Sequence, residues 1–281
     1  MSESPTTLPV VAFLGAGSMA GAIIAGLTRP GVEVEGIRTT NRSAEAAAAY
    51  AGRDGITAYA TDEDADANRS AVAGAKLVVV AVKPAMVPDL LREIAGSLDE
   101  GAVVVSVAAG VTLDTFESIL PAHVSVVRSM PNTPALVGRG VTGVAGGSRT
   151  GEEDLALAVA LFETVGEVIV LPESQIDALS AISGSGPAYV FFLIEQLTAT
   201  AVNLGFTPEQ AALMVQGTFR GASELLAATG EEPAELRRRV TSPKGTTERA
   251  IAVFETAGFG QTFDSATAAA IARAAELAAG K

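Results

Sequence analysis

The sequence contains no cysteine and only one histidine, His123, among its 281 residues. Without cysteine there is no disulfide scaffold, no thiolate metal site and no cysteine nucleophile. One histidine also argues against a multi-histidine metal centre, so no metal site is predicted. His123 follows Pro121 and Ala122 at the start of an expected strand, and we expect it to be a surface residue rather than a catalytic base.

Positive charge is also scarce, because 19 lysines and arginines stand against 32 acidic residues, for a net charge of −13. Nucleic acid is therefore not expected as a partner, and the short run 237–239 of three arginines does not change this. The N-terminus has neither a basic region nor a long apolar core, and the apolar run 77–82 is too short to span a bilayer. We expect a cytoplasmic protein with no membrane partner.

Short apolar runs alternate with helical stretches over the first 170 residues. The expected strands are 10–15, 34–39, 56–60, 76–82, 102–108, 124–130, 140–146 and 167–171. Buried strands that alternate with helices are typical of an α/β fold in which a doubly wound parallel sheet is covered on both faces. This is the architecture of a Rossmann-type domain.

Strand patterns stop after Leu171, and helices follow. We expect them at 175–203, 208–229, 233–240, 246–257 and 262–279. Thr207 and Pro208 form a typical helix start, and Gly205 is suited to end the preceding helix. The sequence therefore predicts two domains, a dinucleotide-binding domain over 1–170 and an all-helical domain over 171–281.

A glycine-rich turn, Gly15-x-Gly17-x-x-Ala20, lies between the first strand and the first helix. Gly15 permits a tight turn, Gly17 lets the backbone approach a pyrophosphate, and Ala20 allows the helix to pack closely on the strand. The phosphates would lie at the helix N-terminus, where free N–H groups attract anions. A strand–helix turn without a ligand is the alternative.

The residues after the second strand predict which dinucleotide binds. An NAD site places an acidic residue there for the ribose hydroxyls, whereas this chain has Asn41, Arg42 and Ser43. These side chains can donate to a 2′-phosphate, so we expect NADPH to be preferred, with NADH as the second cofactor. Arg42 on a solvated helix start is the alternative.

The turns after the fourth and fifth strands should face the same cofactor, mainly through backbone groups. Lys83 is either a catalytic acid or a lysine at a strand end, and Asn132 either points into the site or serves its turn. The expected cofactor-binding residues of the glycine-rich turn and these two turns are Leu14, Gly15, Ala16, Gly17, Ser18, Met19, Ala81, Val82, Lys83, Pro84, Val107, Ala108 and Ala109.

A third motif, Ser183-Gly184-Ser185-Gly186-Pro187, interrupts an expected helix. Glycine costs about 1 kcal/mol and proline about 3 kcal/mol in a helix interior, so the break needs a reason. The segment either kinks and exposes backbone groups or packs closely against another helix through its glycines.

These motifs together resemble the pyrroline-5-carboxylate reductase family over nearly the whole chain. The matching segments are FLGAGSMAGAI, AVKP, SVAAGVT, RSMPNTPALVGRG, ISGSGPAYVF and VTSPKGTTERAI, in the family's order and spacing. The resemblance implies NAD(P)H-dependent reduction of 1-pyrroline-5-carboxylate to L-proline, the last step of proline biosynthesis. It also implies a helical domain that interlocks two subunits into a homodimer, which assembles into a decamer in some members.

The resemblance also implies site residues. Ser242, Gly245 and Thr246 would hold the substrate carboxylate at a helix N-terminus, and Thr247 would be the catalytic residue that hydrogen-bonds the ring nitrogen. Glu173 and Arg239 match further substrate-side positions, and Asn68 matches an asparagine near the adenosine phosphate. Without the resemblance, Thr247 reads as an ordinary helix-start residue.

Lys244 departs from the family pattern, which has glycine at this position. If the position needs a positive φ, lysine is strained there; alternatively, its charge lies beside the carboxylate. Arg239 departs too, since the position is polar and uncharged in some relatives. Both changes are compatible with a different affinity for the substrate or with a preference for a related cyclic imine.

Two other readings differ in what the chain should contain. A β-hydroxyacid dehydrogenase needs a catalytic lysine within a helix of the helical domain, and no such helix is evident. A nucleotide-sensing or vitamin-B6-binding regulator should have lost the substrate loop, which is largely present. The helix around 189–202 is apolar on most faces, so we also expect an obligate oligomer.

Overall fold

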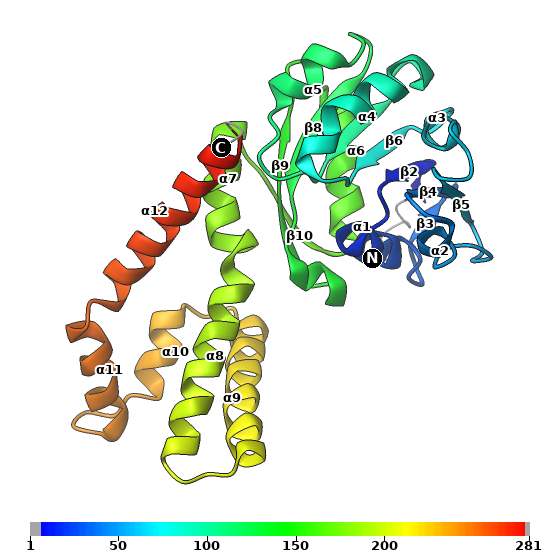
Figure 1. Ribbon diagram of the computed structural model, residues 1–281. Helices are drawn as coiled ribbons and strands as arrows, with labels where there is room; N and C mark the ends of the chain where they lie inside the picture. Colours follow the sequence, from blue (N-terminus) through cyan, green and yellow to red (C-terminus); the bar gives the residue numbers. More distant parts are fainter. Residues whose placement is uncertain (1–6, 279–281) are drawn as a thin grey trace. The chain divides into compact units, whose positions relative to one another are not determined.

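The computed structural model describes residues 7–278 of the chain (Figure 1). They divide into two compact units. The first unit runs to Ser185 and also takes in the chain from Ala270 on, and the second unit is Gly186–Ala269. Each unit has its own arrangement of elements.

An eight-stranded sheet forms the centre of the first unit, with strand order β10-β9-β8-β7-β6-β2-β4-β5. Its strands are β2 (Val11–Leu14), β4 (Ile37–Asn41), β5 (Ile56–Ala60), β6 (Leu77–Val80), β7 (Val103–Ser106), β8 (Ser125–Met130), β9 (Gly140–Gly146) and β10 (Gly166–Val170). Every expected strand is present. The expectation of a parallel sheet was wrong at one place, because β9 runs antiparallel to β8.

The short loop between β8 and β9 explains that reversal. Only the five-residue turn η3 (Thr133–Val137) and its flanks separate the two strands. A parallel partner needs a crossover of about a dozen residues, whereas an antiparallel neighbour needs only a short connection. A separate two-stranded parallel pair, β1 (Thr7–Leu8) with β3 (Glu33–Val34), completes the strands.

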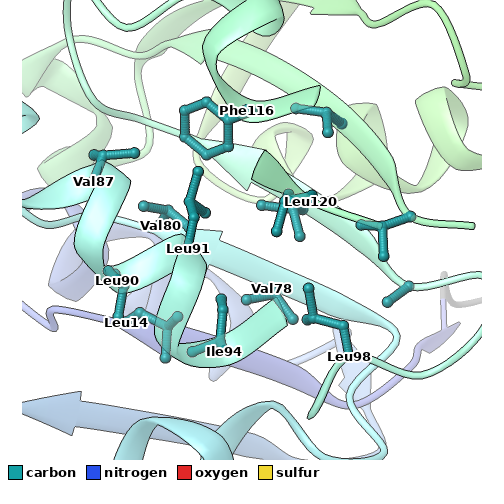
Figure 2. Packing of buried hydrophobic residues seen from close by; sticks show 14 of the residues in the cluster. Leu14, Val78, Val80, Val87, Leu90, Leu91, Ile94, Leu98, Phe116 and Leu120 are labelled. Atoms are coloured by element: carbon teal, nitrogen blue, oxygen red, sulfur yellow. The ribbon is translucent and has the colours of Figure 1, made fainter. Parts of the chain in front are cut away.

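Helices cover both faces of the sheet, because alternate residues of each strand point to opposite faces. Val78 and Val80 belong to the core with α4, whereas Val79 belongs to the core with α1. Figure 2 shows Leu90, Leu91 and Ile94 of α4 directed toward the strands. Further helices of this unit are α1 (Ser18–Leu27), α2 (Ala44–Ala47), α3 (Ala67–Val72), η1 (Pro84–Met86), α4 (Val87–Ile94), η2 (Ala95–Ser97), α5 (Leu113–Ile119) and α6 (Glu152–Glu163).

A continuous helical stretch follows the last strand. It begins with η4 (Glu173–Gln175) and α7 (Ile176–Leu179), and then widens into the π-helical turn η5 (Ser180–Gly184). The Ser185 N–H donates to the Ser180 carbonyl at 2.8 Å, five residues back. The break expected from the glycines and the proline is therefore a π-helical turn, a feature that is frequent at functional sites.

Within the described residues, five helices follow this turn, as expected from the sequence. They are α8 (Gly186–Asn203), α9 (Pro208–Thr229), α10 (Pro233–Arg239), α11 (Thr246–Thr256) and α12 (Phe259–Ala278), and α8 and α9 pack side by side (Figure 1). Thr207 caps α9 in a capping box with Gln210, and Gly205 after α8 has φ +98°. Both terminal signals read from the sequence are confirmed.

Candidate active site

The carboxyl ends of the central strands lie level with one another. Leu14 pairs with Thr40 on one side and Val80 on the other, and Val80 pairs with Ser106. The chain order reverses between β2 and β6, since β4 lies on one flank of β2 and β6 on the other. In open α/β sheets this reversal point is where ligands bind, outside the strand ends.

Two glycines shape the turn after β2. Gly15 has φ +88°, and a Cβ atom added there would lie 2.9 Å from Cγ1 of Val82. Gly17 has no heavy atom within 4 Å of such a Cβ, and as the N-cap of α1 it offers no side chain to the first N–H groups of that helix. The turn therefore leaves open space directly over free N–H donors, as a pyrophosphate requires.

The carbonyl of Ala16 holds this turn in place. It accepts hydrogen bonds from Nδ2 of Asn41 at 3.1 Å and from the hydroxyl of Tyr50 at 3.3 Å. Burial raises the pKa of the Tyr50 hydroxyl, although nearby Arg53 lowers it, so the hydroxyl stays a donor. Oδ1 of Asn41 is buried without a hydrogen-bond partner among the described residues.

A cavity of about 580 Å3 opens outside these strand ends. It is lined by Gly15, Thr40, Asn41, Arg42, Thr61, Ala65, Asn68, Val82, Ala85, Met86, Asp89, Leu90 and Glu93. Five residues predicted to bind a cofactor are among them. The volume falls in the range of small-molecule sites.

The other predicted cofactor residues lie at the strand ends and in the turns that follow, without lining this cavity. They are Leu14, Ala16, Gly17, Ser43, Ala81, Lys83, Val107, Ala108 and Ala109, together with Ser18 and Met19 at the start of α1 and Pro84 at the start of η1. Lys83 is exposed at the start of η1, and its side chain forms no interaction among the described residues. This position fits a lysine at a strand end at least as well as it fits a catalytic acid.

Arg42 and Ser43 differ in how free they are. Oγ of Ser43 accepts the N–H of Ala46 at 3.3 Å, which makes Ser43 the N-cap of α2. The exposed Arg42 guanidinium forms no ion pair among the described residues. Arg42 is therefore a free cation beside the cavity.

Asn68 lies on α3 and faces a carboxylate of the same cavity. Its Nδ2 donates to both carboxylate oxygens of Glu93, at 3.1 and 3.3 Å. The Nε of Arg69 also donates to the Glu93 carbonyl at 3.3 Å, so α3 and α4 are joined at this point.

The cavity and turn fit a dinucleotide on this structure's own features. Gly15 has a conformation that other residues rarely adopt, Gly17 leaves space, and Asn41 holds a buried acceptor without a partner. Backbone donors, a free arginine and acceptor side chains together match the phosphates and ribose hydroxyls of such a molecule. No cluster of three potential metal ligands occurs among residues 7–278.

A buried arginine, Arg128, was missed in the sequence. Its side chain is 5% exposed and pairs with Glu173 at 3.1 Å and Asp177 at 2.6 Å. Oε1 of Glu173 also accepts the N–H of Leu113 at 2.7 Å. Glu173, predicted to bind substrate, is here tied to β8 and to the start of α5. The one signal of Arg128 in the sequence was a charged residue within the apolar run VSVVRSM.

Asn132 serves its turn, which was one of its two open readings. Its Oδ1 accepts the N–H of Val141 at 2.8 Å, and its Nδ2 donates to the carbonyl of Ser183 at 2.9 Å. Both ends of the buried amide are used. Asn132 therefore connects the loop after β8 to the π-helical turn η5.

The second unit contains the loop 241–247, which leads into α11. Lys244 has φ +61° and is the one non-glycine residue with positive φ among the described residues. Its N–H donates to Oε2 of Glu248 at 2.8 Å. The condition under which the sequence predicted strain is thus met. A Cβ atom on Gly245 would lie 2.9 Å from the backbone carbonyl oxygen of Ser242, which cannot turn away, so this position favours glycine.

The predicted substrate residues of this loop lie together. Gly245 is the N-cap of α11 and provides no side-chain acceptor, while Thr246 and Thr247 form its first turn. The hydroxyls of Ser242, Thr246 and Thr247 form no hydrogen bonds within the described part of the chain. Free donors therefore gather at one helix N-terminus.

Arg239 is engaged elsewhere. Its guanidinium pairs with Glu231 at 2.5 Å and with Glu235 at 3.1 Å. Hydrogen bonds from Arg238 and Arg239 lower the pKa of Glu235 to about 2. The charge that the sequence placed near the substrate is thus balanced by two carboxylates. His123 is exposed, with Nε2 3.5 Å from the carbonyl of Leu98, so the surface reading is confirmed.

The Rossmann-type sheet and the glycine-rich turn beside the cavity are typical of nicotinamide-dependent oxidoreductases, and the comparisons place the chain in that class. The model of the family "NADP oxidoreductase coenzyme F420-dependent" matches residues 10–110, and that of "Pyrroline-5-carboxylate reductase dimerisation" matches 173–277. The chain belongs to the pyrroline-5-carboxylate reductase family, because reductases of that name match 96% of it at 40% and 39% identity.

Relatives match it along nearly their whole length. The pyrroline-5-carboxylate reductase of Pseudomonas aeruginosa is 40% identical, over 96% of this chain and 97% of the relative. That of Corynebacterium melassecola is 39% identical, over 96% and 99%. The solved structure of a pyrroline-5-carboxylate reductase from Coxiella burnetii has a TM-score of 0.87 at 37% identity, over 95% of this chain and 97% of that one.

Proposed function

We propose that this chain reduces 1-pyrroline-5-carboxylate to L-proline with NAD(P)H, the last step of proline biosynthesis. The observation that carries the proposal is the match to pyrroline-5-carboxylate reductases along nearly the whole chain. The loop 241–247 supports it, because its free hydroxyls lie at the N-terminus of α11, where an anion such as the substrate carboxylate is favoured.

Binding and orientation are the work of the chain's own residues. Ser242, Gly245 and Thr246 hold the substrate carboxylate through hydroxyl and backbone N–H groups, and Thr247 orients the ring nitrogen by a hydrogen bond. A bound nicotinamide supplies the hydride. Because a cyclic imine is readily protonated in water, its carbon accepts hydride without a strong acid on the enzyme. This fits a chain with no cysteine and one histidine.

The cofactor preference follows from Arg42. A free guanidinium beside the cavity favours the 2′-phosphate of NADPH, and residues 39–43 contain no acidic side chain for an NAD ribose. NADH binds in the same cavity with lower affinity. The glycine-rich turn holds the pyrophosphate, and the turns after β6 and β7 face the remainder of the cofactor.

Oligomerisation follows from the dimerisation model that matches 173–277. The helical stretch Glu173–Asn203 is long and apolar enough to cross a membrane. Only 11% of its most apolar window is buried, so most of this apolar surface is exposed. We interpret this apolar surface as a subunit interface, and propose a cytoplasmic homodimer, which assembles into a decamer in some members of the family. Acidic charge disfavours nucleic acid as a partner.

The domain boundary is proposed near residue 170. The last strand, β10, ends at Val170, and no strand follows it in the described part of the chain. The dimerisation model starts at 173, three residues later. The Rossmann domain would then span 1–170 and the helical domain 171–281.

The test is NADPH oxidation, followed at 340 nm, with 1-pyrroline-5-carboxylate. Thr247→Ala should lower kcat/KM by about ten- to a hundredfold, because a hydrogen bond to a charged group contributes about 1.5–3 kcal/mol. Thr247→Ser keeps the hydroxyl and should retain most activity. No turnover by the wild-type chain, with NADPH still bound, would overturn the proposal and direct attention to other cyclic imines.

A further inference from the structure

The cofactor cavity contains negative charge that a dinucleotide site does not need. Asp89 and Glu93 both line it, one helical turn apart on α4. Asp89 forms an ion pair with Arg92 at 2.7 Å, whereas Glu93 has no cationic side chain within ion-pair distance among the described residues. A nicotinamide dinucleotide is itself an anion, so an unneutralised carboxylate beside it weakens binding unless it has another role.

The contact between Glu93 and Asn68 decides which way the Asn68 amide faces. An ionised carboxylate only accepts hydrogen bonds. The atom of Asn68 that lies 3.1 and 3.3 Å from the two carboxylate oxygens must therefore be the amide nitrogen. The carbonyl oxygen of Asn68 is turned away from Glu93 and has no hydrogen-bond partner among the described residues. It is also not fully buried, so it is open to a ligand.

The orientation is held from two sides. Glu93 receives the amide through both oxygens, and its own carbonyl accepts from Nε of Arg69 at 3.3 Å. Asn68 and Arg69 are neighbours on α3, so the two contacts fix this edge of α3 against α4. Asn68 thus offers the cavity an acceptor, and only one of its two N–H groups is left for a phosphate, because the two oxygens of one carboxylate lie on the same side of the nitrogen.

We propose that Glu93 is a specificity residue that limits the preference of this chain for NADPH, acting through Asn68 and through its own charge. An acceptor at Asn68 suits a ribose hydroxyl or the adenine amino group, which donate hydrogen bonds, and these occur in both cofactors. The carboxylate of Glu93 repels the extra phosphate of NADPH alone. Arg42 and Glu93 therefore act in opposite directions on one cavity, and the inference rests on the proposed cofactor site.

Glu93→Gln separates this role from a merely structural one. The glutamine carbonyl can still accept from Asn68, or its amide can instead donate to the Asn68 oxygen, which leaves both N–H groups of the asparagine for a phosphate. The negative charge is lost in either case. We expect the affinity for NADPH to rise about three- to tenfold while that for NADH changes less than twofold.

The measurement is direct titration of the full-length chain, without substrate, by the fluorescence of NADPH and of NADH. The ratio of the two Kd values is the readout, since damage to the fold weakens both cofactors alike. Glu100→Gln is the matched control, because Glu100 is exposed and does not line the cavity, and its ratio should not change. Arg42→Gln should move the ratio the other way.

A double-mutant comparison keeps the proposal testable. On an Asn68→Ala background, Glu93→Gln retains only its effect on charge, so its change in the Kd ratio should be smaller than in the wild-type background. An unchanged ratio in Glu93→Gln, with both cofactors bound by the wild-type chain, would overturn this inference alone. No binding of either cofactor by the wild-type chain would overturn the proposed function as well.

Discussion

At the scale of single residues, the two glycines of the phosphate-binding turn have different tasks. Gly15 needs a positive φ and close contact with Val82, whereas Gly17 only has to leave space. Gly15→Ala should lower the free energy of unfolding by about 2 kcal/mol, because it adds both strain and a contact that is too short. Thermal unfolding of the chain without cofactor measures this.

Gly17→Ala should leave that free energy within about 0.5 kcal/mol of the wild type, because nothing lies within 4 Å of the added methyl group. The Kd for NADPH should nevertheless rise at least about tenfold, since the methyl group lies where the pyrophosphate must approach the backbone. An unchanged Kd would show that the pyrophosphate does not lie over this turn.

Lys244 is a residue whose backbone conformation would suit glycine better. A left-handed conformation costs a non-glycine residue about 1–2 kcal/mol. Glycine relieves this strain, but its greater conformational entropy in the unfolded chain offsets part of the stabilisation. Lys244→Gly should raise the free energy of unfolding by about 1 kcal/mol. Lys83→Gly is the control, because Lys83 has φ −60° and should gain nothing. Equal changes in both variants would contradict the assignment of strain.

A stabilised Lys244→Gly variant would also show why lysine is present. The ammonium group lies in the loop of the proposed carboxylate site, so its loss should raise KM for the substrate while kcat changes less. The same substitution would then raise the free energy of unfolding and weaken substrate binding. This is a common pattern at functional sites.

At the scale of secondary-structure elements, Arg128 joins β8 to η4 and α7, and Glu173 extends the link to α5. Arg128→Met should lower the free energy of unfolding by about 1.5–3 kcal/mol, because Glu173 and Asp177 would lose their shared partner but, at 30% and 43% exposed, would regain contact with water. Arg273→Met removes an exposed pair with Glu276 and should cost less than about 1 kcal/mol. Denaturant unfolding compares the two. A similar small loss in both would mean that water replaces the guanidinium.

The helical breaks also belong to this scale. Glycine and proline in Ser183–Pro187 predicted an interruption, but their chemistry did not say which kind. The π-helical turn forms where the amide of Asn132 binds the Ser183 carbonyl, and a Cβ on Gly184 would lie 3.1 Å from Oγ of Ser180. The hydrogen bond from Asn132 depends on a loop 51 residues earlier in the chain, whereas the Gly184–Ser180 contact lies within the turn itself.

At the scale of the whole molecule, the second unit exposes large apolar side chains. Phe191 is 61% exposed, Phe192 57% and Leu213 77%, and these helices lie in the segment that matches the dimerisation model. Light scattering should give a mass of at least twice 28.3 kDa. Phe191→Glu with Leu213→Glu should lower that mass, whereas Leu136→Glu in the first unit should not.

A mass of 28.3 kDa for the wild-type chain would contradict the oligomer. It would also leave the apolar surface of α8 and α9 without an explanation, since exposed patches of this kind rarely persist in monomers. The mass itself distinguishes a dimer from a decamer.

The sequence alone determined the elements and much of the site. Periodicity and local signals such as Thr207-Pro208 act over a few residues, so they indicated the strands, the helices of the second unit and the glycine-rich turn. The tertiary structure decided what depends on residues far apart in the chain. It set the reversed direction of β9, the burial of Arg128 between two carboxylates, the pairing of Arg239, and the amide orientation of Asn68, because each depends on partners that only folding brings within hydrogen-bond distance.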